Sequence, residues 1–147
     1  MSMDVRLCVV IDAAPAAVWA EVGRIERHVE WMADAESIAF VGEQRSGAGT
    51  EFECRTRVGP LRTTDVMRVT EWEPERVMGI VHRGLFTGTG RFTLQEATGG
   101  RTRFCWDERI RFPWRTGGPV GERAARPMLT RVWRRNLRAL KALVEGA

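Results

Sequence analysis

The sequence predicts an α+β fold, in which a curved antiparallel sheet of about seven strands surrounds one long C-terminal helix. Three observations lead to this class. The apolar pattern has a period of two over much of residues 36–112, it changes to a helical period over residues 129–144, and two short helical stretches follow the first strand. Short turns between successive strands require antiparallel pairing, because parallel strands need long crossovers.

The first elements follow from local signals. Alternation over Val5–Ile11 predicts a strand, and Pro15 is suited to the first turn of a helix that Gly23 can end. A second short helix is expected over residues 25–32, where Ile25, Val29 and Met32 share one stripe.

The central part of the chain reads as strands separated by Gly, Pro and Glu turns. Alternation is clearest where Phe52, Cys54 and Thr56 face one side and charged residues face the other. The Gly-rich segment 85–90 is expected to be a mobile loop at the mouth of a cavity. The predicted strands cover residues 51–58, 61–72, 77–83, 92–99 and 103–112.

The C-terminal segment gives the strongest periodic signal, and its apolar residues fall on one helical stripe. Pro127 marks either a kink or the start of the regular helix, after a loop over residues 113–119. A wide sheet that curls around a single helix does not close tightly against all of it, so we expect an internal cavity. The stripe consists of Leu129, Val132, Trp133, Asn136, Leu137, Leu140, Leu143 and Val144.

Length and composition predict a single domain over residues 1–147, since 147 residues with 44% hydrophobic content are typical of one globular unit. No stretch approaches 18 apolar residues, and the N-terminus lacks a basic stretch before an apolar one. We therefore expect a cytoplasmic protein without a membrane span.

Charge is unevenly distributed. Residues 1–100 contain 11 basic and 15 acidic side chains, whereas residues 101–147 contain 12 basic and 4 acidic ones. The basic face of the C-terminal helix, with Arg131, Arg134, Arg135 and Arg138, is interpreted as a solvated face, and contact with an anionic membrane surface or a protein is the alternative. No nucleic-acid partner is expected.

Cysteine and histidine are sparse. Cys8, Cys54 and Cys105 are widely spaced and form no C-x-x-C motif, and His28 and His82 are the only histidines. We expect neither a metal nor a cofactor, and a domain of this size needs no disulfide in order to fold.

Several segments resemble the START-like (SRPBCC) superfamily and, within it, the bacterial polyketide cyclase/dehydrase and lipid transport family. The resemblance spans about residues 5–145 and implies a helix-grip fold with a ligand cavity. The family includes aromatase/cyclases, lipid and sterol carriers and hormone receptors, so the likeness does not choose one activity. The matching segments are Ile11–Pro15 with Val18 and Trp19, Trp31, Val69–Pro74, Gly99–Arg103 and Leu137–Glu145.

The predicted ligand site consists of residues that should face the cavity. Asn136 is the most unusual of them, because a buried amide in an apolar stripe needs a hydrogen-bond partner, either in the protein or in a ligand. Trp106 and Trp133 are the candidate stacking surfaces. The predicted ligand-binding residues are Asn136, Trp133, Trp106, Val132, Leu129, Met67, Phe52, Phe104 and Phe86.

Three titratable residues are candidates for proton transfer if the protein is an enzyme. Glu108 shares a strand face with Trp106, Asp65 alternates with apolar neighbours, and His82 has an ambiguous orientation. We expect binding or carriage of a small lipophilic molecule. The alternatives are a polyketide cyclase/dehydratase-type enzyme and a module that associates with a membrane or a protein through the basic helix face.

Overall fold

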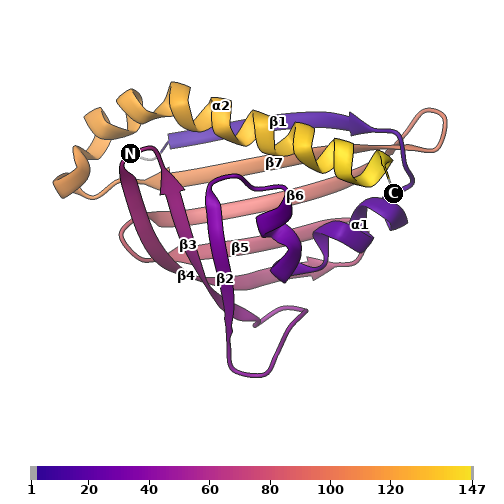
Figure 1. Ribbon diagram of the computed structural model, residues 1–147, viewed down its shortest axis with the longest axis horizontal. Coiled ribbons are helices and arrows are strands. Elements are labelled where there is room, and N and C mark those ends of the chain that lie inside the picture. The colour runs from indigo at the N-terminus through magenta and orange to yellow at the C-terminus, as the bar shows by residue number, and fades with distance from the viewer. Residues whose placement is uncertain (1–2, 147) are drawn as a thin grey trace.

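The computed structural model describes residues 3–146 and shows one antiparallel sheet curved around a long helix (Figure 1). The strands are β1 (Met3–Ile11), β2 (Ala35–Val41), β3 (Glu51–Val58), β4 (Leu61–Glu73), β5 (Val77–Arg83), β6 (Thr87–Ala97) and β7 (Arg101–Arg111). The helices are α1 (Pro15–Val22), the 3₁₀ helices η1 (Ile25–Glu30) and η2 (Trp114–Thr116), and α2 (Gly118–Glu145).

The order of the strands in the sheet is β1-β7-β6-β5-β4-β3-β2. Strands β2 to β7 therefore form a continuous run of hairpins, and β1 pairs with the last of them. In β4 the register shifts between Val69 and Glu71, and in β2 it shifts between Ala35 and Ser37. Such irregularities bend strands, and Figure 1 shows β2 and β3 turning away from the plane of β6 and β7. The predicted fold class, an α+β helix-grip arrangement, is confirmed.

Helix α2 lies across the concave side of the sheet, along β1 and β7 (Figure 1). It begins at Gly118 and continues through Pro127, so this proline lies inside the helix and is not its start. The buried stripe of α2 includes Leu129, Trp133 and Leu140. This stripe follows the helical period that the sequence predicts.

The segment 85–90 differs from the expected mobile loop. Only Gly84–Phe86 form the turn, and Thr87–Gly90 belong to β6, where Gly88 pairs with Ile110 and Gly90 with Glu108 of β7. Gly88 has a φ of +149°, and a Cβ there would collide with the carbonyl oxygen of Arg109. These glycines therefore permit close strand pairing, which the composition of the segment alone does not indicate.

Candidate functional site

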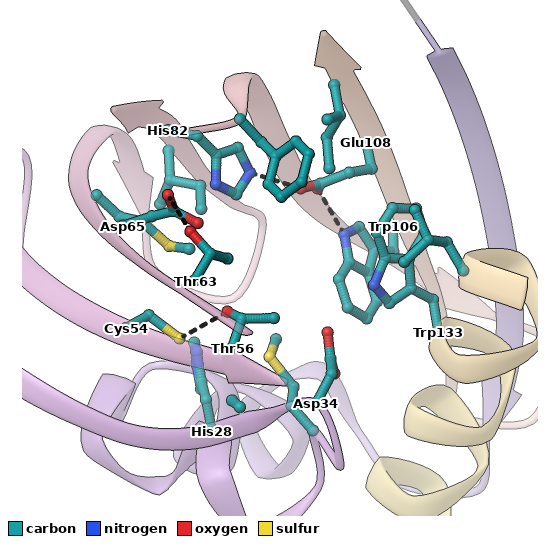
Figure 2. A pocket seen from close by; sticks show the side chains of 18 of the residues that line it. His28, Asp34, Cys54, Thr56, Thr63, Asp65, His82, Trp106, Glu108 and Trp133 are labelled. Carbon is teal, nitrogen blue, oxygen red and sulfur yellow. Dashed lines mark hydrogen bonds and ion pairs between the residues drawn. The ribbon is translucent and has the colours of Figure 1, made fainter. Parts of the chain in front are cut away.

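A cavity of about 130 Å³ lies between the inner face of the sheet and α2. Its wall is mainly apolar, and Figure 2 shows side chains from several strands converging on it together with Trp133 of α2. The position follows from the bent sheet, since β2–β4 curve away from the helix while β6 and β7 stay close to it. Apolar concave sites with a few fixed polar groups are typical of small-molecule binding.

The polar groups at one end of the cavity come from β4, β5 and β7 and form hydrogen bonds within two small sets (Figure 2). His82 Nε2 donates to Glu108 Oε1 over 2.5 Å, and the indole N–H of Trp106 donates to Glu108 Oε2 over 2.9 Å. On the side of β4, the Thr63 hydroxyl donates to Asp65 Oδ1 over 3.2 Å. Two carboxylates and one imidazole are thus held at the edge of an apolar space.

Burial and charge act in opposite directions on His82. Burial alone lowers its pKa, but the adjacent Glu108 carboxylate, through charge and the hydrogen bond, outweighs burial, and Asp65 adds to this effect. The net result is a raised pKa for His82. The pKa of Asp65 is also raised, because burial outweighs the hydrogen bond from Thr63 and the charge of His82. Two groups that can transfer protons, a carboxyl and an imidazole, thus have raised pKa values at the edge of the cavity.

Two glycines leave room for these carboxylates. A Cβ on Gly90 would approach Glu108 Oε2 to 2.5 Å, and a Cβ on Gly84 would overlap Asp65 Oδ1. Neither glycine has a left-handed φ, so backbone conformation does not require glycine there. The missing side chains instead provide the space in which the two acids are buried.

A second set of polar groups lies where α2 faces the chain that follows η1. Asn136 Nδ2 donates to Asp34 Oδ1 over 2.7 Å, and Asn136 Oδ1 accepts from the backbone N–H of Ala33 over 2.9 Å. Burial raises the pKa of Asp34, although hydrogen bonds from Asn136 and Trp133 oppose this. Asn136 thereby connects α2 to the segment between η1 and β2.

His28, which also lines the cavity, is held neutral. Burial lowers its pKa to about 4, and its Nε2 donates to the carbonyl oxygen of Val22 over 2.7 Å. Because Nε2 carries the proton of the neutral ring, Nδ1 is left as an acceptor. No hydrogen bond to Nδ1 exists within residues 3–146.

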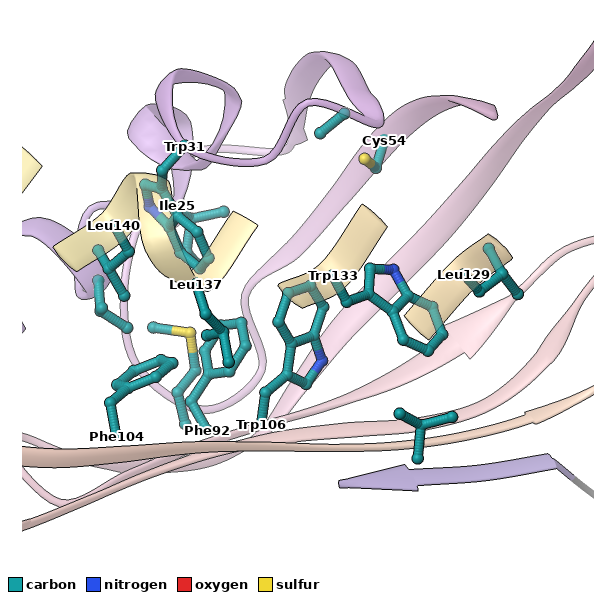
Figure 3. Close-up of a cluster of buried hydrophobic side chains, with 14 of the residues drawn as sticks. Ile25, Trp31, Cys54, Phe92, Phe104, Trp106, Leu129, Trp133, Leu137 and Leu140 are labelled. Atoms are coloured by element: carbon teal, nitrogen blue, oxygen red, sulfur yellow. The ribbon is translucent and has the colours of Figure 1, made fainter. Parts of the chain in front are cut away.

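Beyond the cavity the interior is closely packed by aromatic rings (Figure 3). The ring centroids of Trp106 and Trp133 are 5.6 Å apart, and Trp31 lies 6.2 Å from Trp106 and 5.7 Å from Phe92. These separations are in the range of favourable aromatic contacts. Trp31 is not on the cavity wall, whereas Phe92, Trp106 and Trp133 are, so the packed rings form one boundary of the hollow.

Most of the residues predicted for the site lie on the cavity wall. Asn136 does not, because both ends of its amide are bonded to residues 33 and 34, and Val132 and Phe104 are also absent from the wall. The predicted residues on the wall are Phe52, Asp65, Met67, His82, Phe86, Trp106, Glu108, Leu129 and Trp133.

Sequence reasoning missed the contributions of His28 and Asp34 to this wall. Asp34 lies between η1 and β2, outside any periodic segment. His28 was missed because residues 25–30 form a 3₁₀ helix, in which Ile25 and His28 share the buried face, and not the predicted α-helical stripe of Ile25, Val29 and Met32. The signal available for Asp34 was its position after the apolar stripe that ends at Met32. Among residues 3–146, no group of three potential metal ligands lies together.

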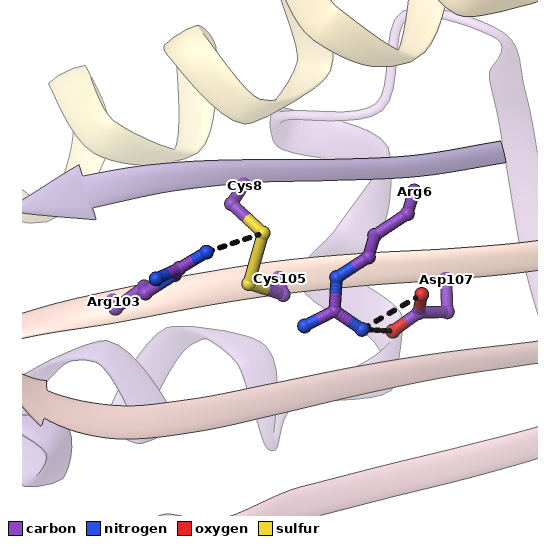
Figure 4. Close-up of a disulfide and its surroundings, with 5 residues drawn as sticks. All are labelled: Arg6, Cys8, Arg103, Cys105 and Asp107. Carbon is purple, nitrogen blue, oxygen red and sulfur yellow. Dashed lines mark hydrogen bonds and ion pairs between the residues drawn. A yellow bond between two sulfur atoms is a disulfide. The ribbon is translucent and has the colours of Figure 1, made fainter.

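Two of the cysteines form a disulfide on the face of the sheet away from α2 (Figure 4). Cys8 and Cys105 are opposite each other in the β1–β7 register, and Cys54 remains free and buried near the cavity. Burial raises the pKa of the Cys54 thiol to about 11, so it stays protonated. Disulfides persist mainly in oxidising compartments. The bond therefore does not favour the cytoplasmic location expected from the sequence.

The family model described as polyketide cyclase/dehydrase and lipid transport matches residues 2–145. No curated protein matches the chain. Among solved structures, TTHA0849 from Thermus thermophilus is 18% identical with a TM-score of 0.79, and 97% of each chain is covered. The Zhui aromatase/cyclase from Streptomyces sp. R1128 is 18% identical with a TM-score of 0.76, covering 99% of this chain and 94% of that one. A START superfamily protein from Mycobacterium smegmatis is 13% identical with a TM-score of 0.79 and 98% coverage of both. At these identities the structural likeness establishes the fold.

Proposed function

Because this chain belongs to the polyketide cyclase/dehydrase and lipid transport family, we propose that it binds a small lipophilic molecule in the cavity between its sheet and α2. The observation that carries the proposal is the cavity itself, which has an apolar wall and a few fixed polar groups at its edges. A solid interior would bury more apolar surface and stabilise the fold further. Space retained inside such a packed protein is therefore best explained by a ligand.

The size of the cavity limits the ligand in this conformation. Its volume of about 130 Å³ is similar to that of an engineered apolar cavity of about 150 Å³ that binds benzene. One substituted aromatic ring is thus a suitable occupant. A longer polyketide or acyl chain requires β2–β4 or the turn at Gly84–Phe86 to move outward.

Native mass spectrometry of the purified protein tests the proposal directly, and an added mass that organic extraction removes is the expected result. Leu129→Phe places a larger side chain on the cavity wall, whereas Val41→Phe makes a related change at a position that is 47% exposed. Ligand retention should be lost in Leu129→Phe and kept in Val41→Phe. Equal retention in both variants, with both folded, would place the ligand elsewhere.

A cyclase- or dehydratase-type enzyme is the second candidate, and the His82–Glu108 contact favours it. A carboxylate hydrogen-bonded to an imidazole can take a proton from a carbon next to a carbonyl group and return it to another atom. The apolar wall would hold the substrate near this pair, and orientation alone lowers a barrier considerably.

Deuterium exchange of 1-phenyl-1,3-butanedione in D₂O, followed by NMR, tests proton transfer without knowledge of the natural substrate. The protein should accelerate exchange, and Glu108→Gln should reduce that acceleration by about 100-fold or more, the usual size of general-base effects, while leaving binding intact. Glu53→Gln changes an exposed carboxylate on β3, outside the cavity wall, and serves as the control. No acceleration by the folded wild type would exclude this candidate and leave the binding function in place.

A further inference from the structure

We propose that the cavity accepts neutral ligands that donate a hydrogen bond, such as phenols and enols, and rejects carboxylates and phosphates. The inference rests on the proposed binding function and adds the chemical class of the ligand. It follows from which donors and acceptors remain available on the cavity wall.

The acceptors are numerous. Asp34, Asp65 and Glu108 each present a carboxyl group to the cavity and are 9%, 5% and 6% exposed. His28 adds the bare Nδ1 of a neutral ring. Each carboxylate oxygen can accept more than one hydrogen bond, so accepting capacity is left over at both polar ends of the cavity.

The donors, in contrast, are already engaged. The indole N–H of Trp106 and Nε2 of His82 both donate to Glu108, and the Thr63 hydroxyl donates to Asp65. Arg91 is the one guanidinium among the lining residues, and it pairs with the exposed carboxylate of Glu71. Any positive charge on His82 is likewise paired with Glu108, so every cation on the described part of the cavity wall already has a carboxylate partner.

An anionic ligand would lose its hydration and meet carboxylates, and it would gain only cations that Glu108 and Glu71 already neutralise. Uncompensated burial of a charge is among the most costly events in a protein interior. A neutral phenol fits these acceptors, because its hydroxyl donates to Glu108, Asp65 or His28 while its ring lies against Trp106. The ring gains apolar contact in either case, so the polar substituent decides the selection.

Three single-ring probes of similar shape separate these effects: 4-ethylphenol donates a hydrogen bond, 4-ethylanisole does not, and 4-ethylbenzoate is an anion at pH 7. Isothermal titration calorimetry at constant ionic strength should give the tightest binding for the phenol. We expect the anisole to bind about 10- to 150-fold more weakly, the loss of one hydrogen bond to a charged group. The benzoate should bind at least about 100-fold more weakly than the phenol.

Glu108→Gln and Asp65→Asn each remove one carboxylate from the cavity wall. Each should therefore reduce the difference in affinity between the phenol and the benzoate. Glu53→Gln, which removes an exposed charge on β3 that is not on the cavity wall, should leave this difference unchanged. If the benzoate binds wild type as tightly as the phenol, the proposed charge selection is wrong while the binding function stands. If none of the three probes binds the folded protein, the binding function fails and the selection fails with it.

A second inference rests on the opposite side of α2, where we infer a docking surface for an anionic lipid bilayer. Six arginines of α2 are exposed, and none of them takes part in an ion pair within residues 3–146. The two acids of this helix do not neutralise these arginines, because Glu122 accepts a hydrogen bond from the backbone N–H of Phe112 and Glu145 pairs with Lys141. The six are Arg123, Arg126, Arg131, Arg134, Arg135 and Arg138.

Exposed apolar side chains at the start of α2 distinguish a bilayer from other polyanions. Trp114 of η2 is 85% exposed, Val120 is 76% exposed and Met128 is 44% exposed. A Trp beside basic residues is suited to the interface between lipid headgroups and acyl chains. Phe112 and Leu129, on the same part of the chain, line the cavity. Docking there would bring the cavity close to the bilayer. No helix within residues 3–146 is long and apolar enough to cross one.

Cosedimentation with vesicles tests this surface. Binding to phosphatidylcholine vesicles that contain 30% phosphatidylglycerol should exceed binding to pure phosphatidylcholine and should weaken at 500 mM salt. The double variant Arg131→Gln/Arg134→Gln should bind about 30-fold more weakly, at about 1 kcal/mol for each arginine near the surface, and Trp114→Ala should also weaken binding. The control Arg55→Gln/Arg57→Gln removes two exposed charges from β3. Equal binding to both vesicle types, or tighter binding to a 20-nucleotide single strand at the same salt, would overturn the inference.

Discussion

Replacing Asn136 by Leu tests whether this residue positions α2 or contacts the ligand. The substitution removes the hydrogen bond to Asp34 and the bond from Ala33 N–H, at a position that is 1% exposed. Position 136 lies outside the cavity wall. We therefore expect the main effect on stability and a smaller one on affinity.

The magnitude follows from the two groups that lose a hydrogen-bond partner, the Ala33 N–H and the Asp34 carboxylate. A buried backbone N–H without a partner costs about 1–2 kcal/mol, and a buried carboxylate costs about 2–3 kcal/mol. The larger apolar side chain recovers about 1 kcal/mol through burial, which leaves a net loss of about 2–4 kcal/mol for Asn136→Leu. The loss should diminish as the pH falls, because the raised pKa of Asp34 would rise further without the amide donor, and a protonated carboxyl needs the donor less.

Urea unfolding, followed by circular dichroism at pH 7 and pH 5, measures this loss. The double variant Asp34→Leu/Asn136→Leu should cost less than the sum of the two single changes, since both partners are then removed together. Affinity for 4-ethylphenol, measured in parallel, should change less than the unfolding free energy. A large fall in affinity with unchanged stability would refute the positioning role and return Asn136 to the ligand site.

Two further predictions concern groups beside the cavity. His28→Gln should make the stability less sensitive to acid, because the pKa of His28 is about 4 in the fold against an ordinary 6.5. Between pH 7 and pH 5 the free energy of unfolding should fall by about 2 kcal/mol more in wild type than in the variant. An equal fall in the free energy of unfolding of both proteins would contradict the conclusion that the His28 ring is neutral in the fold. Gly90→Ala should displace the Glu108 carboxylate and thereby lower the pKa of His82, which an NMR titration measures. The control Gly79→Ala contacts the exposed carboxylate of Glu71 and should leave the pKa of His82 unchanged. An unchanged titration in Gly90→Ala would show that the carboxylate is not confined.

The sheet and α2 could be predicted because both have periodic inner faces. On β7, Phe104, Trp106 and Glu108 alternate with outward-facing residues, and the register with β1 and β6 keeps that orientation. On α2, the stripe through Leu129 and Leu140 is the buried one. Periodicity reports which face of an element is buried, and a single terminal helix leaves little choice of partner for that face.

Periodicity does not report what a buried polar group contacts. Asn136 was correctly placed within the buried stripe, but its partners, Ala33 and Asp34, lie 103 and 102 residues away in the chain. The pairing of Cys8 with Cys105 also depends on a contact between the first and last strands, at a separation of 97 residues. Such contacts are set by the pairing of β1 with β7 and by the position of α2 on the sheet, and no local pattern encodes them.

The burial of Asp65, His82 and Glu108 is more readily explained by function than by stability. A buried ion pair commonly contributes no more than apolar residues of similar volume would, because desolvation offsets the attraction. Here the arrangement has an additional cost, since Gly84 and Gly90 give up side chains so that the carboxylates fit. Gly90 also lies within β6, and glycine within a strand weakens it. Apolar residues at these positions would fill the cavity and strengthen the sheet. A ligand that needs acceptors, or a reaction that needs a proton moved, supplies the reason for retaining these groups inside the protein.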